Sequence, residues 1–208
     1  MKIAVFGATG SVGRHVVRQA EGLGHEVTAL VRDPVKLNDE SVAVVQGDVL
    51  DPVAVRDAVD GQEAVIVVLG AGRRGGVRGP GTRVIIDAMR DAGVQRLIVQ
   101  STLGVGDSRP NLPPVWRYLM FGLLLRPAYA DHVEQEQHVR DSGLRWTIVR
   151  PAAFTDGPRT GVYRHGFGPD AEDLSSKISR ADVADFLLGQ LTSPSYVHRT
   201  PGLSYARP

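Results

Sequence analysis

Three glycines near the N-terminus have the spacing of a phosphate-binding turn. Gly7, Gly10 and Gly13 directly follow an apolar run at residues 2–6, and a helical pattern begins near Ser11. In a strand–turn–helix unit, such glycines permit the tight turn, let the backbone approach a pyrophosphate and let the helix pack closely on the strand. The start of the helix adds free N–H groups and the positive end of its dipole. The sequence therefore predicts a dinucleotide site here rather than an ordinary strand-to-helix turn.

An arginine stands where the adenosine ribose of such a dinucleotide would lie. Arg32 follows a second predicted strand, residues 26–31, about twenty residues after the glycine turn. An acidic residue at this place binds the ribose hydroxyls of NAD, whereas a guanidinium suits the 2′-phosphate of NADP. Lys36 offers a second positive charge, and the nearby Asp33 adds a negative charge that would offset it. The pattern favours NADP, the alternative being that Arg32 and Lys36 are simply exposed surface.

Polar residues follow two further predicted strands, at the edge where ligands bind in open α/β sheets. Asp48 is expected to accept a hydrogen bond from the adenine amino group or to cap the helix that begins near Asp51, and the two roles are compatible. Ser101 and Thr102 lie beside the expected nicotinamide position. Their hydroxyls are expected to bond a substrate carbonyl or a cofactor amide, or else the local backbone.

A strongly apolar segment, LPPVWRYLMFGLLLRP at residues 112–127, interrupts the polar pattern of the second half. It is shorter than the roughly 20 residues that a membrane span needs. Its apolar spacing favours ordinary core packing, while its place after a strand end favours the wall or lid of a pocket for a flat apolar substrate; a dimer contact is the third possibility. Trp116 and Phe121, together with Phe154, are the candidate substrate-binding residues.

Six strand-like runs alternate with helical patterns along the chain. The expected strands are residues 2–6, 26–31, 42–46, 64–69, 96–100 and 145–150. The continuous apolar run AVIVVL at 64–69 is typical of a strand that is covered on both faces. This order predicts an α/β fold, a single-domain, Rossmann-like, doubly wound parallel sheet with helices on both faces. The NAD(P)-binding domain is expected to span residues 1–208, with substrate-side segments around 103–127 and 152–178.

The segments that connect the predicted strands and helices also have recognisable sequence features. Gly70, Ala71 and Gly72 offer no side chain that obstructs a cofactor, and residues 73–81 are expected to form a mobile loop. Residues 155–178 lack periodicity and are expected to be irregular, and a capping pattern starts the last helix at Ser179.

One pair of residues has the spacing of metal ligands. His132 and Glu136 share a face of the helix expected at 128–142, with Asp131 and His138 nearby. A third convergent ligand is not evident, so we expect a solvated helical face and no metal.

Composition excludes several function classes. The 208 residues are 42% hydrophobic and 23% charged, and the net charge of +1 gives no global reason to expect a nucleic acid or an anionic membrane as partner. The absence of cysteine excludes disulfides, thiolate metal sites and cysteine nucleophiles. The expectation is a cytoplasmic protein, monomeric or weakly dimeric, whose partner is a small aromatic acceptor.

Taken together, the motifs match a known family in order. GATGSVG, LVRDPVKL, GDVLD, AVIVVLG, GVQRLIVQS, SGLRWTIVRP and ISRADVADF, spread over residues 2–191, resemble the atypical short-chain dehydrogenase/reductases, an NAD(P)H-binding family. Within it, the chain is most similar to the biliverdin reductase B / flavin reductase group, also through the stretch TGVY at 160–163.

The resemblance assigns roles to individual residues. It implies that the pyrophosphate is lined by Gly7, Thr9, Gly10, Ser11 and Val12. It further implies that Arg32 binds the 2′-phosphate, that Asp48 and Val49 contact the adenine, and that Leu69 and Gly70 lie at the ribose. Ser101, near the nicotinamide and the substrate, is the catalytic candidate, and the nicotinamide side is formed by Pro151, Ala152, Ala153 and Phe154.

Two departures from the family pattern shape the expected chemistry. Short-chain dehydrogenases carry a tyrosine and, four residues later, a lysine; here those places fall on Ala128 and His132, and Tyr129 is one residue off, about 100° around the helix. The histidine that the biliverdin/flavin group has after the sixth strand is replaced by the exit from Ala152 to Phe154. Without the tyrosine and the lysine, the chain lacks the residues that protonate an alkoxide in alcohol and ketone chemistry. Without the histidine, the sequence gives less reason to expect biliverdin itself as the substrate.

The expected function is therefore an NADPH-dependent reductase that transfers hydride to a planar conjugated acceptor, such as a flavin, a quinone or a biliverdin-like molecule, with protons supplied by water. The alternative is a non-catalytic NADP-binding regulator that resembles the NmrA-like redox sensors. A sugar-nucleotide epimerase or dehydratase is a weaker possibility, because the chain lacks both the Tyr–Lys pair and a large substrate domain.

Overall fold

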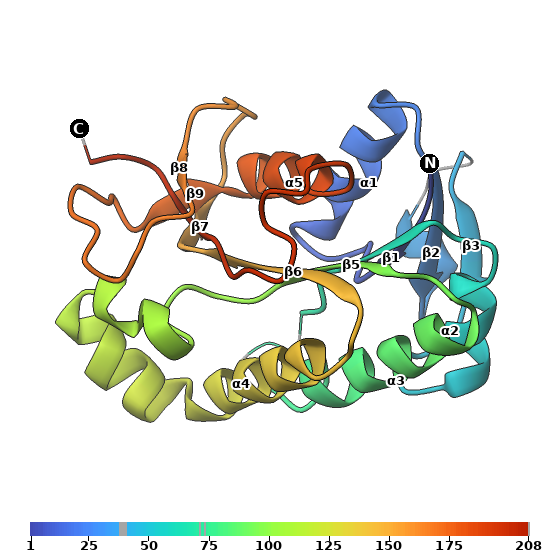
Figure 1. Ribbon diagram of the computed structural model, residues 1–208, viewed down its shortest axis with the longest axis horizontal. Helices are drawn as coiled ribbons and strands as arrows, with labels where there is room; N and C mark the ends of the chain where they lie inside the picture. Colours follow the sequence, from blue (N-terminus) through green and yellow to red (C-terminus); the bar gives the residue numbers. More distant parts are fainter. Residues whose placement is uncertain (38–40, 71, 73, 208) are drawn as a thin grey trace.

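A largely parallel sheet runs through the molecule, as the computed structural model shows for residues 1–37, 41–70, 72 and 74–207 (Figure 1). Its strand order is β3-β2-β1-β4-β5-β6-β10-β8. The six predicted strands are present and mutually parallel: β1 (Lys2–Phe6), β2 (Glu26–Val31), β3 (Ala43–Gln46), β4 (Ala64–Val67), β5 (Arg96–Gln100) and β6 (Arg145–Pro151). This confirms the doubly wound, Rossmann-like fold, in which the order reverses at β1 and β4.

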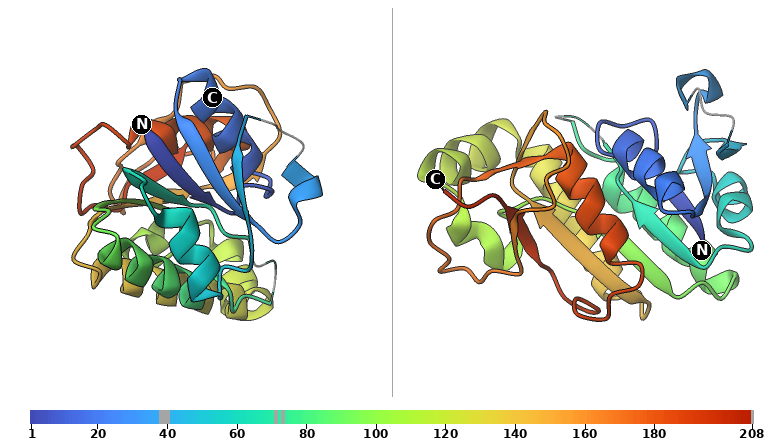
Figure 2. Two further views of the ribbon diagram at one scale, coloured as in Figure 1. Left: turned by 90° about the vertical axis from the view of Figure 1, so that its right-hand side faces the viewer. Right: turned by 90° about the horizontal axis from the view of Figure 1, so that it is seen from above.

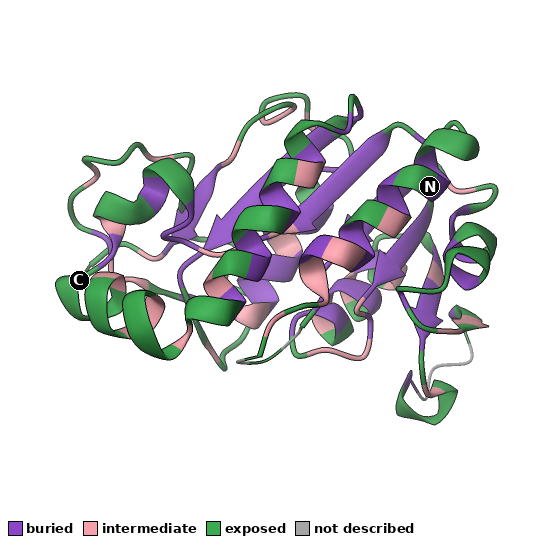
Figure 3. Cartoon of the chain, turned by 90° about the horizontal axis from the view of Figure 1, so that it is seen from below, coloured by how far each residue is buried: buried purple, intermediate pink, exposed green. Residues whose placement is uncertain are grey.

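Helices cover both faces of the sheet, which explains why every residue of β4 is buried. α1 (Gly13–Gly22) and α5 (Arg180–Gly189) lie side by side on one face (Figure 2). α2 (Pro52–Val59), α3 (Arg78–Asp91) and α4 (Arg126–Arg140) cover the other. In Figure 3 these three helices turn buried residues toward the sheet and exposed ones outward. The alternating side chains of the strands thus divide the apolar core into two layers.

Two short strands extend the sheet beyond the predicted six. β10 (Gly202–Ser204) pairs parallel with β6, and β8 (Arg164–His165) pairs antiparallel with β10. A separate parallel pair joins β7 (Ala153–Thr155) to β9 (Lys177–Ser179). The expectation that residues 155–178 are wholly irregular was therefore wrong at β8 and at the ends of the segment, because strands of two or three residues are too short to leave a period in the sequence.

The start of α3 corrects a second expectation. Residues 78–81, assigned to a mobile loop, are its first turn. The carboxylate of Asp131, on α4, accepts hydrogen bonds from the backbone N–H groups of Val77 (3.4 Å), Arg78 (3.2 Å) and Gly79 (3.0 Å). Asp131 therefore caps α3 from a neighbouring helix, and these bonds lower the pKa of its carboxyl although burial alone would raise it.

The apolar segment forms a helix that the core does not cover. After the 3₁₀ turns η1 (Pro34–Leu37) and η2 (Gly106–Asn111), the π-helix η3 (Val115–Leu124) contains no buried residue (Figure 3). The expectation of ordinary core packing at this helix was thus wrong. Across the described ranges, no helix is long and apolar enough to cross a membrane.

Candidate functional site

The turn between β1 and α1 can be built only with glycine at two of its positions. Gly7 has φ +93°, and a Cβ placed on it would lie 2.5 Å from the carbonyl oxygen of Val68. A Cβ on Gly13 would lie 2.1 Å from the carbonyl oxygen of Gly7. Both approaches are far shorter than van der Waals contact, so these glycines bring the turn, the sheet and the start of α1 together as the spacing predicted.

This turn fits the pyrophosphate of a dinucleotide. No acceptor among the described residues bonds the backbone N–H groups of Ser11 and Val12, which precede the first residue of α1. The first turn of α1 contains no acidic residue that would compete with an anion. Arg14 adds a cation beside the turn, where its Nε donates to the carbonyl oxygen of Thr9 (3.2 Å). Free donors, the helix dipole and a guanidinium therefore meet at one place.

The end of β2 presents a free cation. Arg32 is exposed and forms no ion pair within the described ranges. Lys36, by contrast, lies on η1 and pairs with Asp33 (Nζ to Oδ2 3.4 Å). Arg32 is thus the cation available at this strand end, and its contact with a 2′-phosphate stays a prediction.

The expected adenine and ribose wall is brought together by packing. Val49 is buried after β3, Leu69 is buried after β4, and both lie against Gly81 of α3, where a Cβ would stand 2.9 Å from Val49 Cγ1 and 3.3 Å from Leu69 Cδ1. Gly70 is exposed beside them, while Ala71 lies outside the described residues.

Asp48, the polar residue of this region, is exposed after β3. Its Oδ1 accepts from the N–H of Leu50 (2.9 Å), whereas α2 is capped by Asp51, which accepts from Val53 (2.9 Å). Asp48 therefore does not cap α2, and its role at the adenine stays a prediction.

Ser101 directly follows β5, and its hydroxyl bonds a carboxylate. Its side chain is buried, and Oγ donates to Oε1 of Glu136 on α4 (2.7 Å) rather than to the local backbone. Its backbone N–H donates to the carbonyl oxygen of Val149 (2.7 Å), which joins the end of β5 to β6. This geometry favours Ser101 as a positioning residue. A direct catalytic contact of Ser101 stays a prediction. Of the two neighbouring hydroxyl residues, Thr102 is the one that lines the cavity described below.

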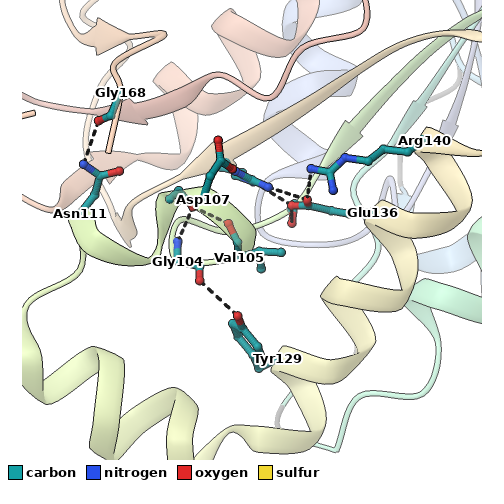
Figure 4. Close-up of polar contacts among 11 residues, drawn as sticks. Gly104, Val105, Asp107, Asn111, Tyr129, Glu136, Arg140 and Gly168 are labelled. Atoms are coloured by element: carbon teal, nitrogen blue, oxygen red, sulfur yellow. Dashed lines mark hydrogen bonds and ion pairs between the residues drawn. The ribbon is translucent and has the colours of Figure 1, made fainter. Parts of the chain in front are cut away.

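Glu136 is the centre of a buried ionic cluster (Figure 4). Besides the Ser101 hydroxyl, its two oxygens accept from Arg150 Nε (2.9 Å), Arg150 Nη2 (2.7 Å) and Arg140 Nη2 (2.9 Å). Glu136 and Arg150 are each 1% exposed. Arg150 Nη1 also bonds Asp107 on η2. The cluster therefore joins α4, β5, β6 and η2 behind the strand ends, with every charge matched.

The cluster fixes the protonation of its members. Burial alone would lower the pKa of Arg150, but its bonds to Glu136 and Asp107 raise that pKa above its ordinary value. The same hydrogen bond to Arg150 holds the pKa of Asp107 below its ordinary value. Both groups stay charged at neutral pH.

The helix face expected to be solvated is in fact buried. Asp131, His132 and Glu136 point into the protein, and burial lowers the pKa of His132 to about 3, so its ring is neutral. The sequence pattern misled because the residues that cover this face, at the start of α3 and on β6, come from distant segments. No group of three potential metal ligands occurs among the residues that the structure describes.

An apolar cavity of about 450 Å³ opens where β5 and β6 end. It brings together the three predicted substrate residues, Trp116, Phe121 and Phe154, although they come from η3 and β7. The Trp116 and Phe121 rings are 6.1 Å apart. The remaining wall comes from the two strand exits, η2 and the segment before α5: Thr102, Leu103, Leu112, Pro113, Pro151, Ala152, Ala153, Ser176 and Arg180.

A glycine and an amide shape this cavity. Gly104 has φ +102°, a left-handed conformation that favours glycine, and a Cβ there would lie 2.2 Å from Leu112 Cδ1, so any larger residue would strain the loop after β5 and displace Leu112. Asn111 Nδ2 donates to the carbonyl oxygens of Gly168 (3.0 Å) and Pro169 (2.9 Å) (Figure 4). The two predicted substrate-side segments are thereby joined.

Tyr129 lies outside the cavity. Its hydroxyl is 3.4 Å from the carbonyl oxygen of Gly104, and its ring packs on Phe121 at 5.5 Å (Figure 4). Ala128 and His132, at the places of the family's tyrosine and lysine, are both buried on α4. Sequence reasoning missed Glu136 and Arg180 as site residues. For Arg180 a signal existed, since it is the third residue of the motif ISRADVADF, but the local pattern indicates only a helix cap.

Comparison with known proteins agrees with this geometry. The model of a family described as NAD(P)H-binding matches residues 7–194. The uncharacterized protein YwnB of Bacillus subtilis is 30% identical over 214 residues, which cover 94% of each chain. Quinone oxidoreductase 2 of Escherichia coli is 27% identical over 192 residues, which cover 88% of this chain and 61% of that protein.

A solved structure is similar over nearly its whole length. ChuY, an anaerobillin reductase from Escherichia coli O157:H7, matches with a TM-score of 0.82 at 26% identity, covering 98% of this chain and 97% of that one. Because the match covers 98% of this chain, the likeness is one of the whole fold and is not confined to the glycine turn.

Proposed function

The chain belongs to the NAD(P)H-binding family, and from that premise we propose that it is an NADPH-dependent reductase of planar conjugated acceptors such as quinones and flavins. The observation that carries the proposal is the apolar cavity at the ends of β5 and β6, with Trp116, Phe121 and Phe154 in its wall. Aromatic walls stack flat conjugated rings better than small aliphatic ketones. Two similar proteins, which are named as a quinone oxidoreductase and an anaerobillin reductase, support the same class of acceptor.

The chain's own residues would hold the cofactor along the strand ends. The donors of Ser11 and Val12 would bind the pyrophosphate, Arg32 the 2′-phosphate, and Val49 and Leu69 the adenosine. Ala152 and Ala153, small residues in the cavity wall, leave room for the nicotinamide beside an acceptor. NADPH, when bound, supplies the hydride.

The protein's task would be to orient the acceptor and to exclude bulk water from one face of it. The acceptor gains the hydride and one proton, and NADP⁺ is left. The described residues of the cavity wall include no carboxyl, imidazole, phenol or amine that could act as a general acid. The proton would therefore come from solvent. Ser101, held by Glu136, would fix the loop that carries Thr102 into the cavity.

We further propose that the reaction proceeds without the tyrosine–lysine mechanism of alcohol dehydrogenases. Tyr129 is directed at Gly104 and not at the cavity, and α4 presents a neutral His132 where that mechanism needs a cation. Alcohol oxidation should therefore be negligible.

The experiment is steady-state oxidation of NADPH with a panel of quinones and flavins, beside aliphatic ketones. Quinones and flavins should be reduced and ketones should not. Trp116→Ala should raise the acceptor KM roughly three- to tenfold without changing NADPH affinity, because a stacking partner is lost. Tyr118→Ala is the matched control, since Tyr118 lies on the same helix but is not part of the cavity wall.

The alternative, a non-catalytic NADP-binding regulator, predicts another outcome of the same assay. NADPH would bind, no acceptor in the panel would be reduced, and Trp116→Ala would leave every measured constant unchanged. That result would replace the reductase proposal.

A further inference from the structure

One charged side chain reaches the apolar cavity. Arg180, the first residue of α5, is the charged member of the wall among the described residues. Its guanidinium carbon lies 5.6 Å from the centroid of the Phe154 ring. The cation is thus placed over the ring on which, by our proposal, the acceptor would stack.

The guanidinium is underused as a hydrogen-bond donor. Of its five N–H groups, one on Nη1 donates to Oδ1 of Asp156 (2.6 Å), and Nη2 has no partner among the residues that the structure describes. Nε is buried and has no partner in the part of the chain that the structure describes. A planar guanidinium with unpaired N–H groups, placed beside an aromatic wall, suits a carboxylate, a sulfonate or a phosphate.

The existing ion pair does not block such a ligand. The Asp156 side chain is 94% exposed, so solvent screens its attraction for Arg180 and it binds only one edge of the fork. His15 of α1 lies in the field of this pair, and burial together with the charges of Arg18 and Arg180 lowers its pKa, so that its ring is neutral. The guanidinium therefore stays open to a second anion on the edge that Asp156 does not occupy.

We propose that Arg180 binds an anionic substituent of the acceptor, so that the enzyme selects acidic aromatic acceptors over neutral ones of the same ring system. The inference rests on the proposed function. The aromatic body of the acceptor would lie among Trp116, Phe121 and Phe154, and its acidic group would meet Nη2 of Arg180 at the cavity wall.

Riboflavin and FMN test this directly, because they share one ring system and differ by a phosphate. Their affinities are measured from flavin fluorescence, in phosphate-free buffer, on titration with the protein loaded with NADP⁺, so that no turnover is needed. FMN should bind roughly tenfold more tightly than riboflavin, as a charge-assisted bond implies. Arg180→Gln should remove that ratio without changing riboflavin affinity, and Arg180→Lys should retain part of it.

Two further variants separate a ligand contact from a structural role. Arg159→Gln removes the same charge from an arginine that pairs with Asp185 outside the cavity (2.7 Å), and it should leave the ratio unchanged. Asp156→Asn should raise FMN affinity about twofold by releasing Nη1, with riboflavin unchanged. A purely structural Arg180 gives no reason for FMN to bind more tightly after that change.

Three results would overturn the proposal. The first is that the protein binds the two flavins with equal affinity. The second is that Arg180→Gln lowers the affinity for both flavins by the same factor. The third is that Arg180→Gln lowers the affinity for NADP⁺, which would show that the guanidinium binds the cofactor. If neither flavin binds, this inference falls, and the proposed reductase is then judged by quinone reduction alone. If FMN is selected through Arg180 but no acceptor in the panel is reduced, the anion site stands and the reductase function falls.

Discussion

Replacing Glu136 by glutamine should destabilise the protein strongly, because the substitution removes the charge at the centre of the buried cluster. The carboxylate accepts bonds from Arg150, Arg140 and Ser101, at distances of 2.7 to 2.9 Å. Arg150 is 1% exposed and keeps only the exposed Asp107 as a counterion. A buried charge that has lost its main partner costs about 3–5 kcal/mol, a large part of the roughly 5–15 kcal/mol by which a native domain is stable.

The assay is equilibrium unfolding in urea, read as the change in free energy of unfolding at unchanged m-value. Glu134→Gln is the matched control, since Glu134 is on the same helix, half exposed and paired with His138; it should change stability by less than about 0.5 kcal/mol. Joint replacement, Glu136→Leu with Arg150→Met, should recover much of the loss because no buried charge remains. A Glu136→Gln protein within about 1 kcal/mol of its parent would refute the reasoning.

Four further outcomes follow from the same geometry. Arg32→Ala should weaken NADPH about tenfold or more in calorimetric titrations and leave NADH little changed, since a bond to the 2′-phosphate contributes roughly 1.5–3 kcal/mol; equal losses would mean that Arg32 binds another part of the cofactor. Ser101→Ala should lower kcat/KM only modestly, and complete inactivity with NADPH still bound would instead give its hydroxyl a direct chemical role. Tyr129→Phe should be nearly as active as its parent, whereas a dead variant would restore the tyrosine mechanism. The pKa of His132 is lowered from 6.5 to about 3, so the unfolded chain takes up a proton first as the pH falls. The stability from neutral His132 is therefore complete above pH 6.5 and is lost toward pH 3 by about 1.4 kcal/mol per pH unit; His132→Gln should show a flatter decline than His138→Gln in unfolding experiments between pH 6.5 and 4.5, and identical slopes would contradict the assignment.

The parts of the fold that local pattern determines were predictable. Gly7 and Gly13 mark a turn because a strand precedes them and a helix follows, and the structure needs glycine at both. The buried run at β4 indicated a strand covered on both faces, which it is. Ser179 was expected to cap the last helix, and its Oγ accepts from the N–H of Asp182 (3.0 Å). In each case the residues that carry the predictive pattern lie within one short stretch of the sequence.

The parts that depend on distant segments were not predictable. Asp131 caps a helix that begins more than fifty residues earlier, and Glu136 is buried only because Arg150 of β6 lies over it. The exposed η3 has the composition of a core helix, and no local signal shows that nothing packs on its outer side. Arg180 follows an ordinary helix cap in the sequence, and only the fold places it in the wall of the cavity.

The central claim is that an acceptor in this cavity receives hydride directly from the cofactor. The measurement that tests it is a single-turnover reaction of the NADPH complex with a quinone, repeated with NADPH deuterated at C4 on one face and then on the other. The account predicts that the quinone is reduced in step with oxidation of the bound NADPH, and that deuterium on one face alone slows the reaction. Tightly bound NADPH that stays reduced in the presence of excess quinone would contradict it.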